Sequence, residues 1–491
     1  MTIQFSKNTF KNSNLGKGSA DFSFDIRQSD TEIRDDIFPG QNIGLAVNIQ
    51  EMKIITNDNI EVDLLEVYDG IGIKEGLYTT FIQGTIRIVD PVGGLEKFAL
   101  RGGERLYLKV CKPNGDVIIW RRDLIISKIG VADFDIMSYK TSYDLQFISS
   151  AFVYALRKNM YKSFSSQSIA DIVLNVYDEI STNALFIEDP KVTLANTSYQ
   201  CSGKMPHEVI LDMSKRACSK NRFFVFFERF VPVFGRATDT QGELTAFSAS
   251  HYFGSIEKLI EDSEKFANYN IFFKREVRGD VEPSYIRAFS FRRLDSFRHI
   301  ESLRKGFYGT EFCSINILNR KCKNQNVGYL DAKNVNLYPN KLIGPNNIFA
   351  SLNKSLGEVP GKKVFVSSMN DPVNRESWLK HEHVKRIETV HFKVAIEIAG
   401  ATNNIGIGNI VNLAIPSGTA KAQQPTSSII RYDPIHSGKY IVTGVDHIIR
   451  NGQYLKNLEL SRDSLPFSFE NATSDNFIIN NIEAFITGRV S

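Results

Sequence analysis

Two separate regions of this chain, residues 43–155 and 375–465, alternate apolar and polar residues with the period of a half-buried β-strand. In the first region, for example, Ile86 and Ile88 lie on one face of a predicted strand and Arg87 lies on the other. Turn signals separate short strands of this kind, and few helices interrupt them. Each region is therefore predicted to fold as an antiparallel β-barrel or sandwich.

The two regions resemble each other in the order of their strands. The first carries three strand-like runs after a glycine turn, at Leu106–Val110, Leu124–Ile129 and Tyr143–Phe147. The second carries three similar runs after its own glycine pair, at Val411–Ile415, Tyr440–Val445 and Tyr454–Leu460. We interpret this echo as a duplication. Two similar barrels per chain would let three chains present six similar units around one axis.

A mixed segment follows the first region. Apolar residues at helical spacing predict a helix over Ile169–Ile180, with Ser168 as a candidate N-cap. A second helix is predicted to start at Pro206 and to end near Asn221, directly before the aromatic strand Phe223–Phe227. These elements predict one inserted α+β domain.

The expected fold is thus mainly β, with two antiparallel β-barrels separated by an inserted mixed domain. Residues 346–374 are irregular, a short helix is expected near Arg375–Arg386, and a long polar loop is expected over Pro416–Ser437. The predicted division is an N-terminal arm at 1–42, a first barrel at 43–155, an α+β insert at 156–260, a mixed β and irregular domain at 261–374, a second barrel at 375–465 and a C-terminal tail at 466–491.

The charge pattern argues against two classes of partner. The formal net charge is only +4, and basic and acidic residues are interleaved, so no specific nucleic-acid binding is expected. The densest basic cluster, expected to be solvated or subunit-facing surface, is Arg292, Arg293, Arg298, Arg304 and Lys305. No run of 18 apolar residues occurs and the polar N-terminus lacks a signal peptide, so neither membrane insertion nor secretion is expected.

The five cysteines are odd in number and form no Cys-x-x-Cys pair. They are Cys111, Cys201, Cys218, Cys313 and Cys322. Cys313 and Cys322 are the nearest pair, but no flanking histidine gives them zinc-finger spacing. All five are expected to be reduced and mostly buried thiols of a protein made in a cytoplasm.

Candidate catalytic and binding motifs are weak. His381, His383 and His391 form the densest histidine group, but positions two apart on a helix do not face each other, so no metal site is predicted. Gly70-Ile-Gly72 and Gly406-Ile-Gly408 do not complete a nucleotide-binding motif and are expected to be turns or strand starts.

No nucleophile motif stands out, and paired carboxylates are expected to be helix surface. These pairs are Asp178 with Glu179 and Glu261 with Asp262. The chain is therefore expected not to be an enzyme, with no catalytic, cofactor-binding or metal-binding residues and no cofactor.

Several runs, in order from Phe81 to Leu465, resemble the baseplate hub subunit of contractile-tailed, T-even-like bacteriophages and the related hub part of type VI secretion spike proteins. They are Gly84-Thr-Ile-Arg-Ile-Val-Asp90, Gly102-Gly-Glu-Arg-Leu-Tyr-Leu108, the helix beginning near Ser168, Met205-Pro-His-Glu-Val-Ile210 with the strand Phe223–Phe227, Gly306-Phe-Tyr-Gly309, Ser437–Ile449 and Leu458–Leu465. The resemblance implies two tail-tube-like barrels around an inserted domain, and it transfers no catalytic residue. Residues 1–42 and the Pro416–Ser437 loop have no counterpart in it.

The resemblance also implies a role: a homotrimeric, pseudo-six-fold ring that joins the tail tube to the central spike in the virion baseplate. Its implied partners are further copies of the chain, the spike protein, the tail tube protein, the tape-measure protein and other baseplate wedge proteins. Two alternatives remain open. One is another tail-end structural protein, such as a distal tail or tube-initiator subunit, and the other is a phage cell-wall hydrolase.

Overall fold

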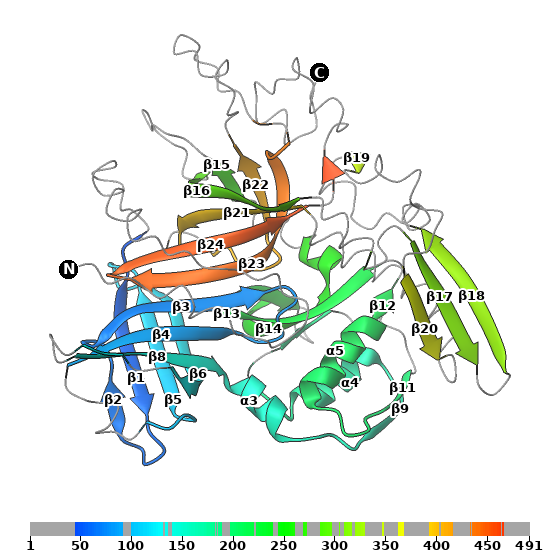
Figure 1. Ribbon diagram of the computed structural model, residues 1–491, viewed down its shortest axis with the longest axis horizontal. Helices are drawn as coiled ribbons and strands as arrows, with labels where there is room; N and C mark the ends of the chain where they lie inside the picture. Colours follow the sequence, from blue (N-terminus) through cyan, green and yellow to red (C-terminus); the bar gives the residue numbers. More distant parts are fainter. Residues whose placement is uncertain are drawn as a thin grey trace, which may run out of the picture.

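The computed structural model describes residues 45–465 with internal gaps (Figure 1). The gaps are 92–99, 131–132, 136–139, 182, 184, 189–196, 220–221, 239–243, 261–268, 273–284, 297–303, 305–308, 317–319, 329–345, 348–361, 368–391, 402–403, 416–432, 434 and 463. The predicted arm at 1–42, the helix near Arg375–Arg386, nearly all of the Pro416–Ser437 loop and the tail at 466–491 lie outside the described residues.

One 14-stranded sheet contains both predicted barrel regions. Its first part runs in the order β2-β1-β5-β6-β8-β4-β3, and every pairing in it is antiparallel. These strands are β1 (Asn48–Ile55), β2 (Glu61–Asp63), β3 (Tyr68–Gly76), β4 (Gln83–Asp90), β5 (Arg105–Cys111), β6 (Val117–Ile129) and β8 (Lys140–Ser149), and β7 (Asp133–Asp135) pairs with β8. Alternate residues such as Ile86, Leu108 and Leu145 are fully buried and form the first core.

The second part of the sheet closes on itself. It runs β23-β22-β15-β16-β21-β24, and a further pairing of β23 with β24 completes a six-stranded barrel. The strands are β15 (Tyr269–Phe272), β16 (Tyr285–Ser296), β21 (Phe392–Ala399), β22 (Ile410–Ala414), β23 (Gly438–Arg450) and β24 (Gln453–Ser461). Residues such as Ile396, Val411 and Leu458 fill its core. The predicted hairpin turn is present, with Asn451 and Gly452 both at positive φ.

The two parts share one strand order. When the six main strands of each part are numbered along the chain, both follow the order 1-4-5-6-3-2 in space. The pairings 4–5, 5–6, 6–3 and 3–2 are antiparallel in both. The three runs that echo each other in the sequence occupy matching places, as β5 and β22, β6 and β23, and β8 and β24. The strand correspondence predicted from the sequence is therefore confirmed.

Strand 1 is where the two parts differ. β1 pairs antiparallel with β5, whereas β15 lies parallel to both β22 and β16 and closes the second barrel. In the first part β3 pairs instead with β23 of the second barrel, over Gly70–Gly76. The residues before β1 bridge the tip of the β23–β24 hairpin, because Val47 N donates to Gly452 O and Tyr454 N donates to Leu45 O. The first part is thus completed by the second barrel.

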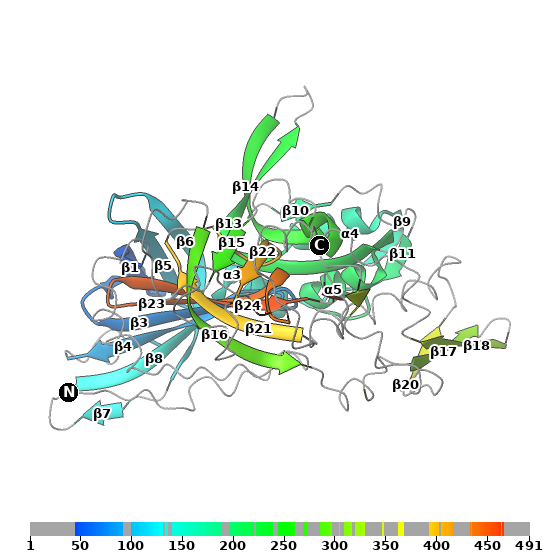
Figure 2. The same cartoon turned by 90° about the horizontal axis from the view of Figure 1, so that it is seen from above.

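The α+β insert lies beside the seam formed by β3 and β23 and has a hydrophobic core of its own (Figure 1). Its elements are α3 (Ser150–Arg157), β9 (Ser163–Gln167), α4 (Ile169–Tyr177), β10 (Leu185–Ile187), β11 (Thr197–Gln200), α5 (Pro206–Arg216), β12 (Cys218–Ser219), β13 (Arg222–Thr238) and β14 (Leu244–Ser255). Ser168 caps α4, since its hydroxyl accepts from Asp171 N at 3.1 Å. The far end of the β13–β14 ribbon projects from the rest of the molecule in Figure 2.

A small sheet lies away from these units in both views (Figures 1 and 2). Its order is β18-β17-β20, formed by β17 (Gly309–Asn316), β18 (Lys321–Gly328) and β20 (Lys362–Ser367). Two further short strands, β19 (Asn346–Asn347) and β25 (Ser464–Leu465), pair with each other.

The mainly β fold with an α+β insert is confirmed, with three corrections of detail. The second barrel is not wholly antiparallel. It also includes β15 and β16, which lie in the interval 261–374 that the sequence analysis assigned to a separate domain. The sequence predicts strands at Tyr269–Arg275 and Arg287–Phe291, close to β15 and β16, but it assigned them to a separate domain because their pairing partners lie far along the chain. The helix α5 ends at Arg216 rather than near Asn221, because Cys218 and Ser219 pair with β13.

A close approach between strands constrains Gly84 of β4. A Cβ at this position would overlap the Phe147 ring and meet Gly72 O at 2.8 Å, so Gly84→Ala is expected to lower the free energy of unfolding by about 1–3 kcal/mol. Gly70 of β3 is the matched control, since its nearest neighbours lie at an ordinary 3.6 Å. Gly70→Ala should leave stability unchanged or raise it by less than about 1 kcal/mol. Denaturant unfolding of both variants checks this, and equal effects would contradict it.

Candidate functional site

The strand β13 carries a large bulge where the first part of the large sheet, the second barrel and the insert meet. Glu228 pairs with His251 and Val233 pairs with Ala249, so residues 229–232 face Ser250 alone. Such extra residues leave the ladder and bend the strand. Phe230 of the bulge is fully buried in the first core, while Phe227, just before it, belongs to the second core. The bulge therefore joins the insert to both parts of the large sheet.

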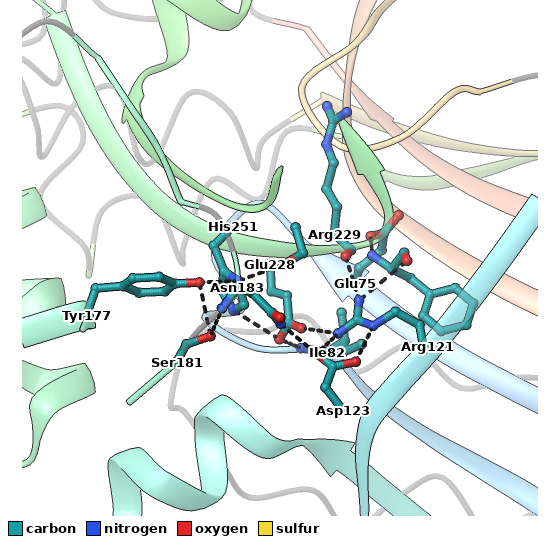
Figure 3. A network of polar contacts seen from close by, with 12 residues as sticks. Glu75, Ile82, Arg121, Asp123, Tyr177, Ser181, Asn183, Glu228, Arg229 and His251 are labelled. Atoms are coloured by element: carbon teal, nitrogen blue, oxygen red, sulfur yellow. Dashed lines mark hydrogen bonds and ion pairs between the residues drawn. The ribbon is translucent and has the colours of Figure 1, made fainter. Parts of the chain in front are cut away.

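Arg121 of β6 fastens this bulge to the first part of the sheet (Figure 3). Its guanidinium donates to Glu228 Oε1 at 2.5 Å and to both oxygens of Asp123 at 2.6 and 2.8 Å. Its Nη1 also donates to the backbone carbonyls of Arg229 at 3.0 Å and Phe230 at 3.4 Å. The side chain is 4% exposed. One buried cation thus satisfies two carboxylates. It also satisfies two backbone carbonyls that the bulge removes from the strand ladder.

The charges around Arg121 hold both carboxylates ionised. Burial alone would raise the pKa of Glu228, but the neighbouring His251 and Arg121 keep this pKa below its ordinary value. Burial likewise opposes ionisation of Asp123, and the charge of Arg121 together with hydrogen bonds from Arg121 and Asn183 lowers the pKa of Asp123. The junction is therefore an ion-pair cluster at neutral pH.

A line of polar contacts extends the cluster into the insert (Figure 3). Tyr177 OH of α4 lies 2.8 Å from His251 Nδ1, and His251 Nε2 lies 3.6 Å from Glu228 Oε2. Ile82 N, just before β4, donates to the same Glu228 oxygen at 3.2 Å. Burial raises the pKa of Tyr177, so its hydroxyl stays protonated. The line connects a helix, the β13–β14 ribbon and the large sheet.

A second group continues the junction toward the closed barrel. Glu75 of β3 accepts from Phe230 N at 2.7 Å and lies 3.0 Å from His447 Nε2 on β23. His447 Nδ1 contacts Tyr454 OH at 2.7 Å, and Lys456 donates to Ile405 O at 3.1 Å. Burial lowers the pKa of His447, which favours its neutral form, and lowers the pKa of Lys456 to about 8.

The charges of the two groups balance. Three cations lie in the junction, and the same number of carboxylates lies with them; they are Arg121, Arg229 and Lys456 with Glu75, Asp123 and Glu228. Buried charges are tolerated only when they are compensated, and here three cations accompany three carboxylates. The junction is therefore suited to hold the three units in one fixed arrangement.

The Tyr177–His251–Glu228 line has the residue types of a proton relay, but its position does not suit catalysis. The side chains of His251 and Glu228 are both 0% exposed. A substrate must reach a catalytic group, so this line can act only on atoms already inside the fold.

Sequence reasoning named no site residue and missed this junction. One signal was available: in β6 the buried positions Ile119, Arg121 and Leu124 follow each other across the strand. A charged residue at an inward-facing position of an apolar strand calls for a buried partner. That partner, Glu228, lies 107 residues away and could not be named from the sequence.

The motifs singled out in the sequence lie elsewhere. Gly70 and Gly72 lie inside β3, whereas Gly406 and Gly408 form the turn before β22, with Gly408 at φ +79°. Arg292, Arg293 and Arg304 are exposed, as expected for a surface cluster, while Arg298 and Lys305 lie outside the described residues. His381, His383 and His391, and the pair Glu261 and Asp262, also lie outside them. Within the described part of the chain, no group of three potential metal ligands occurs.

The cysteines were expected to be mostly buried thiols. Cys111, Cys201 and Cys313 are buried, whereas Cys322 is exposed, and the side chain of Cys218 is not described. The sulfur atoms of Cys313 and Cys322 lie 2.8 Å apart.

No family model and no curated protein sequence matches the chain. Solved structures do. The chain is similar to phage tail proteins and to proteins of type VI secretion systems.

A 43 kDa tail protein of prophage MuSo2 from Shewanella oneidensis is 11% identical, with 84% of this chain and 98% of that chain covered and a TM-score of 0.46. A tail protein from Neisseria meningitidis is 10% identical, with 86% and 98% covered and a TM-score of 0.47. A type VI secretion component from E. coli, described as similar to T4 tail proteins gp27 and gp5, is 9% identical, with 89% and 79% covered and a TM-score of 0.37.

Among the helices that the structure describes, none combines the length and the apolar character needed to cross a membrane.

Removing one partner of the buried ion pair should be costly. Arg121→Met leaves Glu228 and Asp123 without their cation and is expected to lower the free energy of unfolding by about 3–5 kcal/mol. The matched control is Lys53→Met, whose pair with Glu61 has side chains 35% and 64% exposed; it should cost less than about 1 kcal/mol. Urea unfolding monitored by circular dichroism gives both values. A loss for Arg121→Met no larger than the control's would contradict a structural role for the junction.

Proposed function

We propose that this chain is a structural subunit of a phage tail: the hub of a contractile baseplate. Three copies would form a pseudo-six-fold ring that joins the tail tube to the central spike. The observation that carries the proposal is the pair of six-stranded units with one strand order on a single chain. A trimer of such chains carries six similar units, so a three-fold partner below and a six-fold partner above can both be matched.

The seam between the two units supports this role. β3 and β23 continue one sheet across the chain, and the buried junction fixes their relative position through Glu75 and His447. A ring that transmits load between a tube and a spike needs subunits that do not hinge. Compensated buried charges supply that rigidity, because opening the seam would separate each charge from its partner.

The internal seam also suggests how copies would meet. Within the chain, strand 2 of the first unit (β3) pairs with strand 5 of the second (β23). A pseudo-six-fold ring repeats this contact between copies, which places strand 2 of the second unit (β16) beside strand 5 of the first unit (β6) of the next copy. Beyond Arg287, β16 has β21 on one side and no strand on the other among the described residues. This edge is the one a neighbouring copy would cover.

The partners in this proposal are further copies of the chain, the spike protein, the tail tube protein, the tape-measure protein and baseplate wedge proteins. The chain would be made in the host cytoplasm and act in the virion. It would have no catalytic activity, cofactor or metal, and the junction described above would be structural.

The proposed ring predicts a mass and a shape. Light scattering of the purified chain, alone and with its spike protein, should give about three times the 55.5 kDa chain mass, and averaged particle images should show six similar lobes. A dimer, or a monomer that persists with the spike protein present, would overturn the ring.

Hydrogen exchange tests the contact between copies. Amides of β16 over Ala288–Ser296 and of Ser127–Ile129 at the end of β6 should exchange more slowly in the assembly than in the dissociated chain. The control is β21, which is paired on both sides within one chain and should change little. Equal protection of β16 in both states would show that copies meet elsewhere.

Two alternatives remain. Another tail-end structural protein, such as a distal tail or tube-initiator subunit, would form a ring of different copy number, which the mass measurement separates. A cell-wall hydrolase would give a clearing band on zymograms of bacterial cell walls, whereas the hub proposal expects none. The full burial of His251 and Glu228 favours the structural role over the hydrolase.

A further inference from the structure

The outer hairpin of the small sheet brings two cysteines together. β17 and β18 pair antiparallel, with Cys313 opposite Asn324 and Ile315 opposite Cys322. Directly opposite residues share a face of a sheet, so the two cysteines lie diagonally on one face. Their sulfur atoms are 2.8 Å apart, and Cys322 also lies 3.4 Å from Asn324 Oδ1.

The accessibility of the two thiols differs in a useful way. Cys322 is exposed to solvent, whereas Cys313 is buried. Arg320, Lys321 and Lys323 adjoin Cys322 in the sequence, so an anionic oxidant such as glutathione disulfide is attracted to this thiol. A low-molecular-weight disulfide can therefore reach Cys322 first, and Cys313 is placed to complete the exchange.

We propose that Cys313 and Cys322 form an intrachain disulfide when the protein leaves a reducing compartment. Cys322 loses its proton to solvent and attacks one sulfur of glutathione disulfide, which releases one glutathione thiolate. Cys313 then loses its proton and attacks the Cys322 sulfur, which releases the second glutathione thiolate. Two cysteine thiols are oxidised to one disulfide, and one glutathione disulfide is reduced to two glutathione molecules. The sulfur atoms need to move together only from 2.8 Å to about 2.05 Å.

The bond would fasten an edge of the small sheet. Its strand order is β18-β17-β20, so among the described residues β18 is held by β17 alone. A covalent link between these two strands keeps the outer strand in place in a compartment where neither thioredoxin nor glutathione reduces the disulfide back to thiols. This chemistry belongs to the hairpin and does not depend on the proposed function.

The test treats the full-length reduced chain with glutathione disulfide under native conditions. We expect a mass loss of about 2 Da per chain, because two thiol hydrogens leave, and a loss of two maleimide-reactive thiols after denaturation. Trypsin cleaves after Arg320 and Lys321, so Cys313 and Cys322 fall on different peptides. Those peptides should be recovered as one disulfide-linked species that dithiothreitol separates.

Single variants assign the two roles. Cys313→Ser should stop at a stable mixed disulfide between Cys322 and glutathione, and Cys322→Ser should take up neither glutathione nor a crosslink at this hairpin. Cys201→Ser, which removes a buried thiol elsewhere, should keep the linked peptides. The peptide map of the unsubstituted chain decides the question even if a variant fails to fold. Retention of both thiols, a lasting mixed disulfide in the unsubstituted chain, or a link between two chains would overturn the proposal.

Discussion

The arrangement of this protein depends on one buried ion pair, Arg121 with Glu228. The two residues come from different units, and the bulge that carries Glu228 gives up ladder hydrogen bonds to reach the junction. Arg121 replaces them by donating to two of the bulge carbonyls. Because a buried charge without its partner is costly, the insert cannot leave the large sheet without exposing Arg121, Glu228 and Asp123 together.

The same junction explains why the first six-stranded unit need not close by itself. In the second barrel β15, which is strand 1, pairs with β16, which is strand 2, and so closes the barrel, whereas in the first unit strand 2, β3, pairs with β23 instead. An unpaired strand edge exposes backbone donors and acceptors, so a unit that does not close must find a neighbour. Here the neighbour is the second barrel of the same chain, and Glu75 of β3 is held there by His447 and by the bulge.

Sequence patterns predicted the elements well and their long-range partners only in part. The alternation around Ile86 and the repeated strand runs led to the correct correspondence of β5, β6 and β8 with β22, β23 and β24, because strand period and turn residues are local properties. The assignment of β15 and β16 to the second barrel was missed, since a parallel pairing such as Ile271 with Leu413 depends on residues far apart in the chain. The junction was missed for the same reason: Arg121 is visible as an inward-facing charge, but its partners are not.

The one difference between the two units bears on symmetry. Strands 2 to 6 agree in order and direction, so the surfaces they form can take equivalent places in a ring. Strand 1 is antiparallel to its neighbour in β1 and parallel in β15, and it is the strand that decides whether a unit closes alone. The β3–β23 pairing joins the two units of the chain in one sheet, and in the proposed ring such pairs would alternate around an axis.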